Sequence, residues 1–219
     1  MSARAPAAPR LRGLIERSAQ RTAPAASAAA VERCGMCGAP VPDQHRHIAD
    51  LSHQRLLCAC RACVLLFDHR GAGAAGRLWC LIPERCVPLP GLELDDIAWR
   101  SLGLPVEMAF FVRDGRSGRV RAFYPSPAGS TECELALDCW QEIETANPAL
   151  GDMEPDVEAL LVNRTGAGGP AAFLTGIDEC YRLVAIIRRS WRGFTGGELV
   201  WSEIARFFAA LRERASGRP

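Results

Sequence analysis

Two pairs of cysteines near the N-terminus could bind a metal ion. The first pair is Cys34-Gly-Met-Cys37, followed by Gly38, and the second pair is Cys60-Arg-Ala-Cys63. Two thiolates on a tight turn can point at one ion, and Gly after the second Cys suits the positive φ of such turns. Two pairs with a spacer of this length are typical of zinc ribbons. We therefore predict that these four cysteines bind one metal ion.

Three neighbouring side chains could alter this ligand set. Cys58 lies two residues before Cys60, so both would share one face of a strand, and either could bind the ion beside Cys63. Cys60 is the preferred ligand because Cys60 and Cys63 repeat the spacing of the first pair. His45 and His47 are alternates that could replace a thiolate, support a ligand through a hydrogen bond, or lie in a polar surface loop.

Zinc is the expected metal because four thiolates suit it and no redox chemistry is then required. Iron, in a rubredoxin-like site or an iron–sulfur cluster, is the alternative because it also takes four cysteine ligands. A catalytic zinc would need an open coordination position and a nearby acid or base. Glu32 and Asp50 lie close by in the sequence, but nothing in the sequence fixes their geometry.

Composition narrows the classes of function. The 219-residue chain has a formal net charge of +1, which argues against nucleic acid as a partner. All 26 basic residues are Arg, which excludes a Schiff-base lysine and a phosphate-loop lysine. Because no apolar segment is long enough for an export signal or a membrane span, we expect a cytoplasmic protein. Ten cysteines in a reducing compartment favour metal binding over disulfides.

The sequence predicts three regions. Residues 1–31 are rich in Ala, Arg and Pro and are expected to form a disordered tail. Residues 32–70 are expected to form the four-cysteine, zinc-ribbon-like module, and the Gly/Ala stretch 71–76 a flexible joint. Residues 77–215 are expected to form an α+β domain, with a small mixed sheet, packing helices and helices at its C-terminus.

Hydrophobic periodicity and turn residues locate the elements of this domain. Apolar runs predict strands over 78–82, 106–112, 120–124, 159–162 and 172–175. The turn residues 114–118 predict a hairpin between the second and third of these strands. Helices are expected from 130 or 131 to 144, from about 178 to 191, and after the Gly196-Gly197 break. The loop at 123–132 would then connect a strand to a helix, whose free amides could receive an anion.

Several segments also resemble an uncharacterised bacterial family whose members are often encoded beside uptake [NiFe]-hydrogenase genes. They are Cys34-Gly-Met-Cys37-Gly-Ala-Pro, His45-Arg-His47, Leu57-Cys-Ala-Cys-Arg-Ala-Cys63, Ala122-Phe-Tyr-Pro-Ser-Pro-Ala-Gly129, Glu154-Pro-Asp-Val-Glu-Ala-Leu-Leu-Val-Asn-Arg164 and Ile177-Asp-Glu-Cys-Tyr-Arg-Leu-Val184. The resemblance implies a role in hydrogenase maturation, assembly or function, with a hydrogenase subunit or maturation factor as partner. Together with the absence of a legible catalytic constellation, it suggests a non-catalytic metal-binding accessory protein. An iron-containing electron-transfer accessory protein is the alternative.

Overall fold

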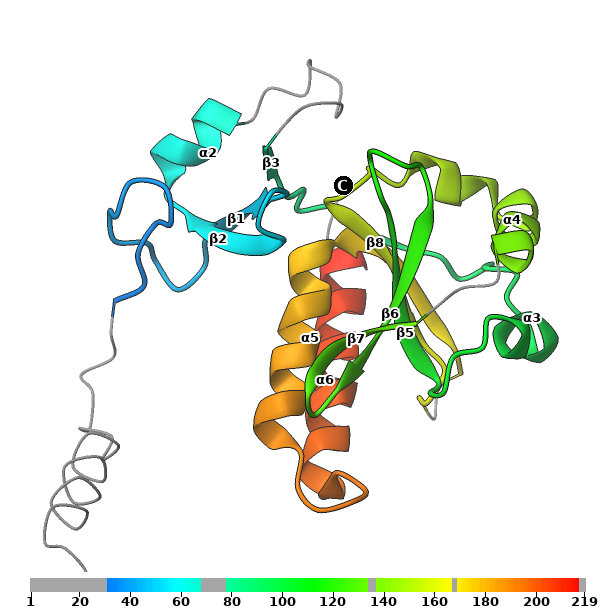
Figure 1. Cartoon of the computed structure of the whole chain (residues 1–219). Helices are drawn as coiled ribbons and strands as arrows, with labels where there is room; N and C mark the ends of the chain where they lie inside the picture. The colour runs from blue at the N-terminus through cyan, green and yellow to red at the C-terminus, as the bar shows by residue number, and fades with distance from the viewer. Residues whose placement is uncertain (1–30, 68–77, 134–136, 167–168, 217–219) are drawn as a thin grey trace, which may run out of the picture.

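The computed structural model describes residues 31–67, 78–133, 137–166 and 169–216. The predicted tail, apart from Val31, and the predicted joint at 71–76 lie outside the described residues. The described residues form an α+β structure with two sheets (Figure 1). Every strand pairing in both sheets is antiparallel, so the prediction of a mixed sheet is wrong. Short hairpin connections, which can join only antiparallel strands, account for much of this arrangement.

The smaller sheet has the strand order β2-β1-β3. It contains β1 (Arg46–Asp50), β2 (Arg55–Ala59) and β3 (Trp79–Leu81), and α2 (Arg61–Phe67) follows β2. The buried Asp50 closes the β1–β2 hairpin, because its carboxylate accepts hydrogen bonds from Ser52 Oγ at 2.6 Å and Arg55 Nε at 2.9 Å. β3 follows the predicted joint but pairs with β1. The chain therefore completes the smaller sheet before it enters the larger one.

The larger sheet has the order β4-β9-β8-β5-β6-β7. Its strands are β4 (Cys86–Pro88), β5 (Met108–Arg113), β6 (Val120–Ser126), β7 (Gly129–Cys133), β8 (Glu158–Asn163) and β9 (Ala171–Gly176). The helices that accompany it are α3 (Asp96–Ser101), α4 (Leu137–Ala146), the 3-10 helix η1 (Pro148–Asp152), α5 (Ile177–Ser190) and α6 (Gly197–Ser216). In Figure 1, α5 and α6 lie side by side on one face of the sheet, and α3 and α4 lie on the other.

Helices on both faces explain why the central strands are continuously apolar. Along β5, Phe110 points into the core formed with α5 and α6, whereas Phe111 points into the core on the opposite face. Phe111 stacks on Trp140 of α4 at a centroid distance of 4.9 Å. A strand covered on both faces loses the alternation of apolar and polar residues that a half-exposed strand shows.

The predicted C-terminal helices are confirmed by their buried faces. The residues of α6 that the 3.6-residue period placed on one face are all buried in the core: Val200, Ile204, Phe207, Phe208 and Leu211. α5 begins at Ile177 and buries Cys180, Leu183, Val184 and Ile187 on the same side. In the described part of the chain, no helix combines the length and apolar character needed to cross a membrane.

The helix expected from residue 130 or 131 is wrong at its start. Residues 129–133 form β7, which pairs with β6 in the register Ser126↔Gly129 through Ala122↔Cys133, and α4 begins at Leu137. The Pro-containing loop is therefore a hairpin turn, where Gly129 adopts φ +137°. No helix starts directly after this loop, so it offers no helix-terminal amides to an anion. Cross-strand pairing overrode the capping signal of Ser130 and Thr131.

The β5–β6 hairpin gives a first testable prediction. Asp114 Oδ1 accepts hydrogen bonds from the backbone N–H groups of Arg116 and Ser117 and from the Ser117 hydroxyl. The Ser117 groups lower the pKa of Asp114. Its contribution to stability is therefore fully present above the unfolded pKa of about 4 and is lost as the pH falls from there through the lowered native pKa. We expect Asp114→Ala to lower the free energy of unfolding at pH 7 by about 1–2 kcal/mol.

Urea unfolding followed by tryptophan fluorescence would measure this effect. Asp114→Asn is the matched control, because it keeps the acceptor oxygen and removes the charge. It should retain part of the lost stability at pH 7 and show a weaker dependence on acid than the unmodified protein. Equal stability of Asp114→Ala and the unmodified protein at pH 7 would contradict the assignment.

Candidate metal centre

The four predicted cysteine ligands lie together in the smaller module. The sulfur atoms of Cys34, Cys37, Cys60 and Cys63 all lie within 4.8 Å of one another. The Cys37 and Cys60 sulfurs are 3.6 Å apart, and none of the four forms a disulfide. Sulfur atoms bound tetrahedrally to zinc at about 2.3 Å are separated by about 3.8 Å. The predicted convergence of the two pairs is confirmed, and the cluster could hold one metal ion.

The first pair lies on a tight knuckle before β1. The Cys34 backbone N–H donates to Ala39 O at 2.8 Å, and the Gly38 N–H donates to Cys34 O at 2.9 Å. Gly38 adopts φ +74°, which agrees with the expectation for the residue after the second cysteine. The Gly35 N–H donates to Cys58 O at 2.8 Å and ties the knuckle to β2. The β1–β2 hairpin therefore holds the first pair against the second.

The second pair occupies the start of a helix. Cys60 directly precedes α2, and Cys63 lies in its first turn, where the Val64 N–H donates to Cys60 O at 3.0 Å. The second pair therefore repeats the spacing of the first pair but not its conformation. The segment after Cys60 lacks the Gly that permits the knuckle at Gly38, and Ala62, Leu65 and Leu66 favour helix.

Backbone N–H groups beside the sulfur atoms influence the pKa values of the cysteine thiols. Burial raises the pKa of the Cys34 thiol, but the N–H groups of Cys60, Cys37 and Met36 outweigh it and bring this pKa to about 6. The N–H of Cys63 is the main cause that lowers the pKa of Cys60. Burial and the neighbouring cysteines raise the pKa of Cys63 to about 12. The cluster therefore resists holding four thiolates at once, unless a cation neutralises them.

The alternates Cys58, His45 and His47 lie outside this four-sulfur group. They form a second group, in which one potential ligand atom from each residue lies within 4.8 Å of the others. The geometry therefore places Cys60, as preferred, and not Cys58 beside Cys63. The exposed His53 hydrogen bonds to Asp50 in the hairpin turn, and His69, the fourth histidine, lies outside the described residues.

The smaller sheet packs against the start of α5 and the adjoining loops. Ala49, Ile82 and Val157 form a small buried cluster that Ile177 joins. A Cβ on Gly176 would lie 2.7 Å from Pro83 O and 2.8 Å from Ile82 Cγ2, so the backbones approach closely here. This contact joins the smaller module to the larger domain.

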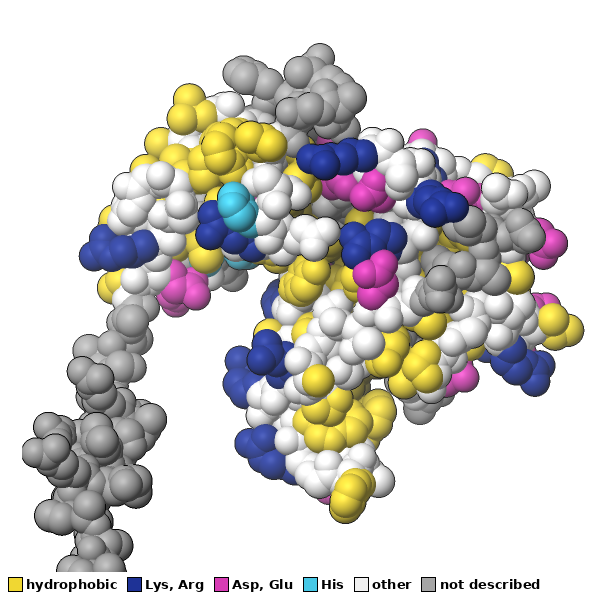
Figure 2. Space-filling model, in the orientation of Figure 1, with side chains coloured by type: hydrophobic (Ala, Val, Ile, Leu, Met, Phe, Trp, Pro, Cys, Tyr) yellow, Lys and Arg dark blue, Asp and Glu magenta, His cyan; other side chains and the backbone are white. Residues whose placement is uncertain are grey.

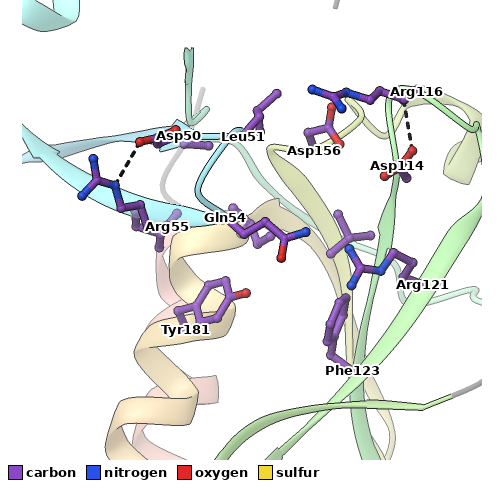
Figure 3. Close-up of a pocket in the computed structure, with 14 residues that line it drawn as sticks. Asp50, Leu51, Gln54, Arg55, Asp114, Arg116, Arg121, Phe123, Asp156 and Tyr181 are labelled. Atoms are coloured by element: carbon purple, nitrogen blue, oxygen red, sulfur yellow. Dashed lines mark hydrogen bonds and ion pairs between the residues drawn. The ribbon is translucent and has the colours of Figure 1, made fainter. Parts of the chain in front are cut away.

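A cavity of about 540 Å³ lies beside this contact. The β1–β2 turn supplies one wall with Leu51 and Gln54, and α5 and β6 supply the opposite wall with Tyr181, Arg121 and Phe123 (Figure 3). Figure 3 shows the amide of Gln54 pointing toward Arg121. Carboxylates and guanidinium groups line the cavity together with apolar side chains, so a ligand that combines polar and apolar groups would fit it.

The residues matched by a known family model include the four cysteines, the second group and both sheets. The model is that of a family of unknown function (DUF5947), and it matches residues 33–215. The chain belongs to this family. No curated protein matches the chain, and no solved structure matches it. The predicted resemblance to an uncharacterised family is thus confirmed.

Sequence reasoning missed three features of this region. It did not predict the cavity, because its walls come from segments that are distant in the sequence. It also did not predict that Asp178 on α5 would reach His47 on β1, with Oδ2 and Nδ1 2.9 Å apart. The alternation of His45 and His47 and the position of Cys58 were visible signals for the second group. Taken from the sequence, however, the two histidines are substitutes for a thiolate, supports of a ligand or surface loop residues, and Cys58 is an alternative to Cys60.

Proposed function

We propose that the protein is a non-catalytic metal-binding accessory protein, associated with the maturation, assembly or function of a [NiFe]-hydrogenase. Its smaller module would fold around one structural zinc ion held by Cys34, Cys37, Cys60 and Cys63, in a zinc-ribbon-like arrangement. The observation that carries this proposal is the approach of four thiol sulfurs to within 4.8 Å of one another. Four protein ligands complete a tetrahedral shell, which is typical of structural rather than catalytic zinc.

A structural ion would also stabilise the fold of the smaller module. The apolar cluster beneath the knuckle consists of Cys34, Val41 and Cys63, with Met36 and two further cysteines packed against it. Such a core is too small to fold a module of this size without help, and structural metals supply the missing free energy in small domains. Zinc is favoured over iron because a structural ion only has to cross-link the two cysteine pairs, which requires no redox chemistry.

An exposed aromatic loop supports the role of an interaction protein. Phe194, between α5 and α6, is fully exposed, and Leu199 and Trp201 of α6 are also exposed. Figure 2 shows hydrophobic side chains gathered at this end of the two helices. Exposed aromatic residues are enriched at protein interfaces and often carry most of the binding energy. The resemblance of the sequence to a family often encoded beside uptake [NiFe]-hydrogenase genes favours a hydrogenase subunit or maturation factor as the partner.

Metal analysis of anaerobically purified protein tests the metal assignment. We expect a colourless protein with at least one zinc ion per chain, and a sulfur-rich zinc shell in X-ray absorption spectra. Iron with absorbance between about 350 and 550 nm that bleaches on reduction would instead support the electron-transfer alternative. Metal-free protein with a folded smaller module would contradict both assignments.

Co-purification with tagged hydrogenase subunits and maturation factors tests the partner assignment. Phe194→Asp should reduce capture by roughly tenfold or more, because a charge would replace an aromatic contact. Ile97→Asp on α3 is the matched control, since Ile97 is a comparably exposed apolar residue on a distant helix. Capture of no tested hydrogenase component, or equal capture of both variants and the unmodified protein, would contradict the proposed partner or the proposed surface, respectively.

A further inference from the structure

The second group of potential ligands lies on one face of the β1–β2 hairpin. His47 and Cys58 are direct partners in the antiparallel register, and His45 lies two residues before His47. Side chains two residues apart in extended chain share a face, and direct partners on that face are close. Backbone pairing therefore brings two imidazoles and one thiol together, with one ligand atom from each within 4.8 Å of the others.

Hydrogen bonds on the far side of both rings prepare the remaining nitrogens to bind a metal. His45 Nδ1 lies 2.8 Å from Pro42 O, and His47 Nδ1 lies 2.9 Å from Asp178 Oδ2. Both partners are acceptors, so in the neutral imidazole each Nδ1 carries the proton and each Nε2 has the lone pair. A backbone carbonyl or carboxylate behind the ring is the usual arrangement for histidines that bind metals.

The His45 ring is not otherwise satisfied. Its side chain is only 6% exposed, and Nε2 is buried without a hydrogen-bond partner among the described residues. The nearest carboxylate oxygen, Glu32 Oε2, is 3.7 Å away, too far for a hydrogen bond. A buried polar atom without a partner is rare and points to a bound ion or water.

We propose that His45 Nε2, His47 Nε2 and Cys58 Sγ bind a second divalent transition-metal ion, separate from the four-cysteine site. Zinc is the ion that best suits two imidazoles and one thiolate. The three protein ligands would leave a fourth position for water, and Glu32 Oε2 lies 3.7 Å from His45 Nε2. It would therefore differ from the closed four-cysteine site in keeping an exchangeable position. Asp178 is a positioning residue, because it orients His47 from a helix of the other domain.

Metal counting on the full chain separates the two sites. We expect two zinc ions per chain in the unmodified protein and one in His47→Gln. The average shell in X-ray absorption spectra should change from about 2.5 to about four sulfur ligands per zinc. His53→Gln is the matched control, because His53 is an exposed histidine of the same module outside the group. It should keep both ions.

The outcomes distinguish this site from the proposed function. Retention of one sulfur-coordinated zinc in His47→Gln shows that the module is still folded, so loss of the other ion assigns the second site. A single zinc ion in both the unmodified protein and His47→Gln would overturn the second site and leave the structural zinc intact. If X-ray absorption spectra show no zinc with an all-sulfur shell in any of these proteins, the structural site would instead be overturned.

Asp178→Asn tests the positioning role. Loss of a carboxylate behind a metal-binding histidine typically weakens metal binding 10- to 100-fold. We expect this decrease for one zinc ion in competition with a fluorescent chelator, while the other ion keeps its affinity. A selective decrease for one ion would support the positioning role, because a purely structural contact has no reason to act on one ion alone. Unchanged affinity for both ions would contradict this role of Asp178.

Discussion

Replacement of Cys63 by Ser is expected to release the ion from the four-cysteine site and to unfold the smaller module. Zinc contributes about 10–16 kcal/mol to the folding of small structural zinc domains, far more than a core of a few buried side chains. The larger domain should stay folded, because it has its own two cores on either face of the six-stranded sheet. The second site should also be lost, since the β1–β2 hairpin holds its ligands.

Hydrogen exchange followed by mass spectrometry would measure this effect region by region. Peptides that cover β1 and β2 should lose protection in Cys63→Ser, whereas peptides that cover β5 and β8 should keep it. Cys139→Ala is the matched control, because Cys139 is a partly buried cysteine of α4 and packs in the larger domain. Full protection of the β1–β2 hairpin in metal-free Cys63→Ser would show that the ion is not structural.

The second large effect is expected at an ion pair of the larger domain, in which the carboxylate is buried and the guanidinium group is partly exposed. Glu158 is 1% exposed, and its carboxylate accepts two hydrogen bonds from Arg85, from Nε at 2.8 Å and from the terminal nitrogen at 2.5 Å. Arg85 also donates to Asp152 O, and the Glu154 N–H donates to Glu158. Arg85→Met would leave a buried carboxylate without its cation, which typically costs about 3–5 kcal/mol.

Urea unfolding would measure this loss in the free energy of unfolding. Arg206→Met is the matched control, because Arg206 forms an exposed pair with Glu203 on α6 and should change stability by about 0–1 kcal/mol. The double variant Arg85→Met/Glu158→Leu should recover much of the stability, since no charge then remains buried. A loss below about 1 kcal/mol in Arg85→Met would show that water reaches Glu158.

The features that the sequence predicted correctly depend on local signals. The period of apolar residues identified α6 and its buried face, and the two cysteine pairs identified the four-sulfur cluster. Both signals reflect short-range geometry, which a single sequence carries. The turn residues at 114–118 likewise predicted the β5–β6 hairpin.

The features that it missed depend on contacts between distant segments. β7 is polar and lies at the edge of its sheet, so it lacks the alternation that marks a half-buried strand. The strand order of the larger sheet brings β4 beside β9, and no local pattern encodes that pairing. His47 and Asp178 are 131 residues apart, so neither predicts the other. Tertiary packing alone joins them.

The position of the cavity has a consequence for communication between the two parts of the protein. One wall, formed by residues of the β1–β2 turn, belongs to a hairpin that we expect to depend on metal for its fold. A molecule that fills the cavity would consequently bind only to the loaded form. Because coupling between two binding sites is reciprocal, the same molecule would raise the affinity for the ion by the factor by which the ion raises the affinity for the molecule. Occupancy of the cavity would thus depend on whether the smaller module holds its metal ion.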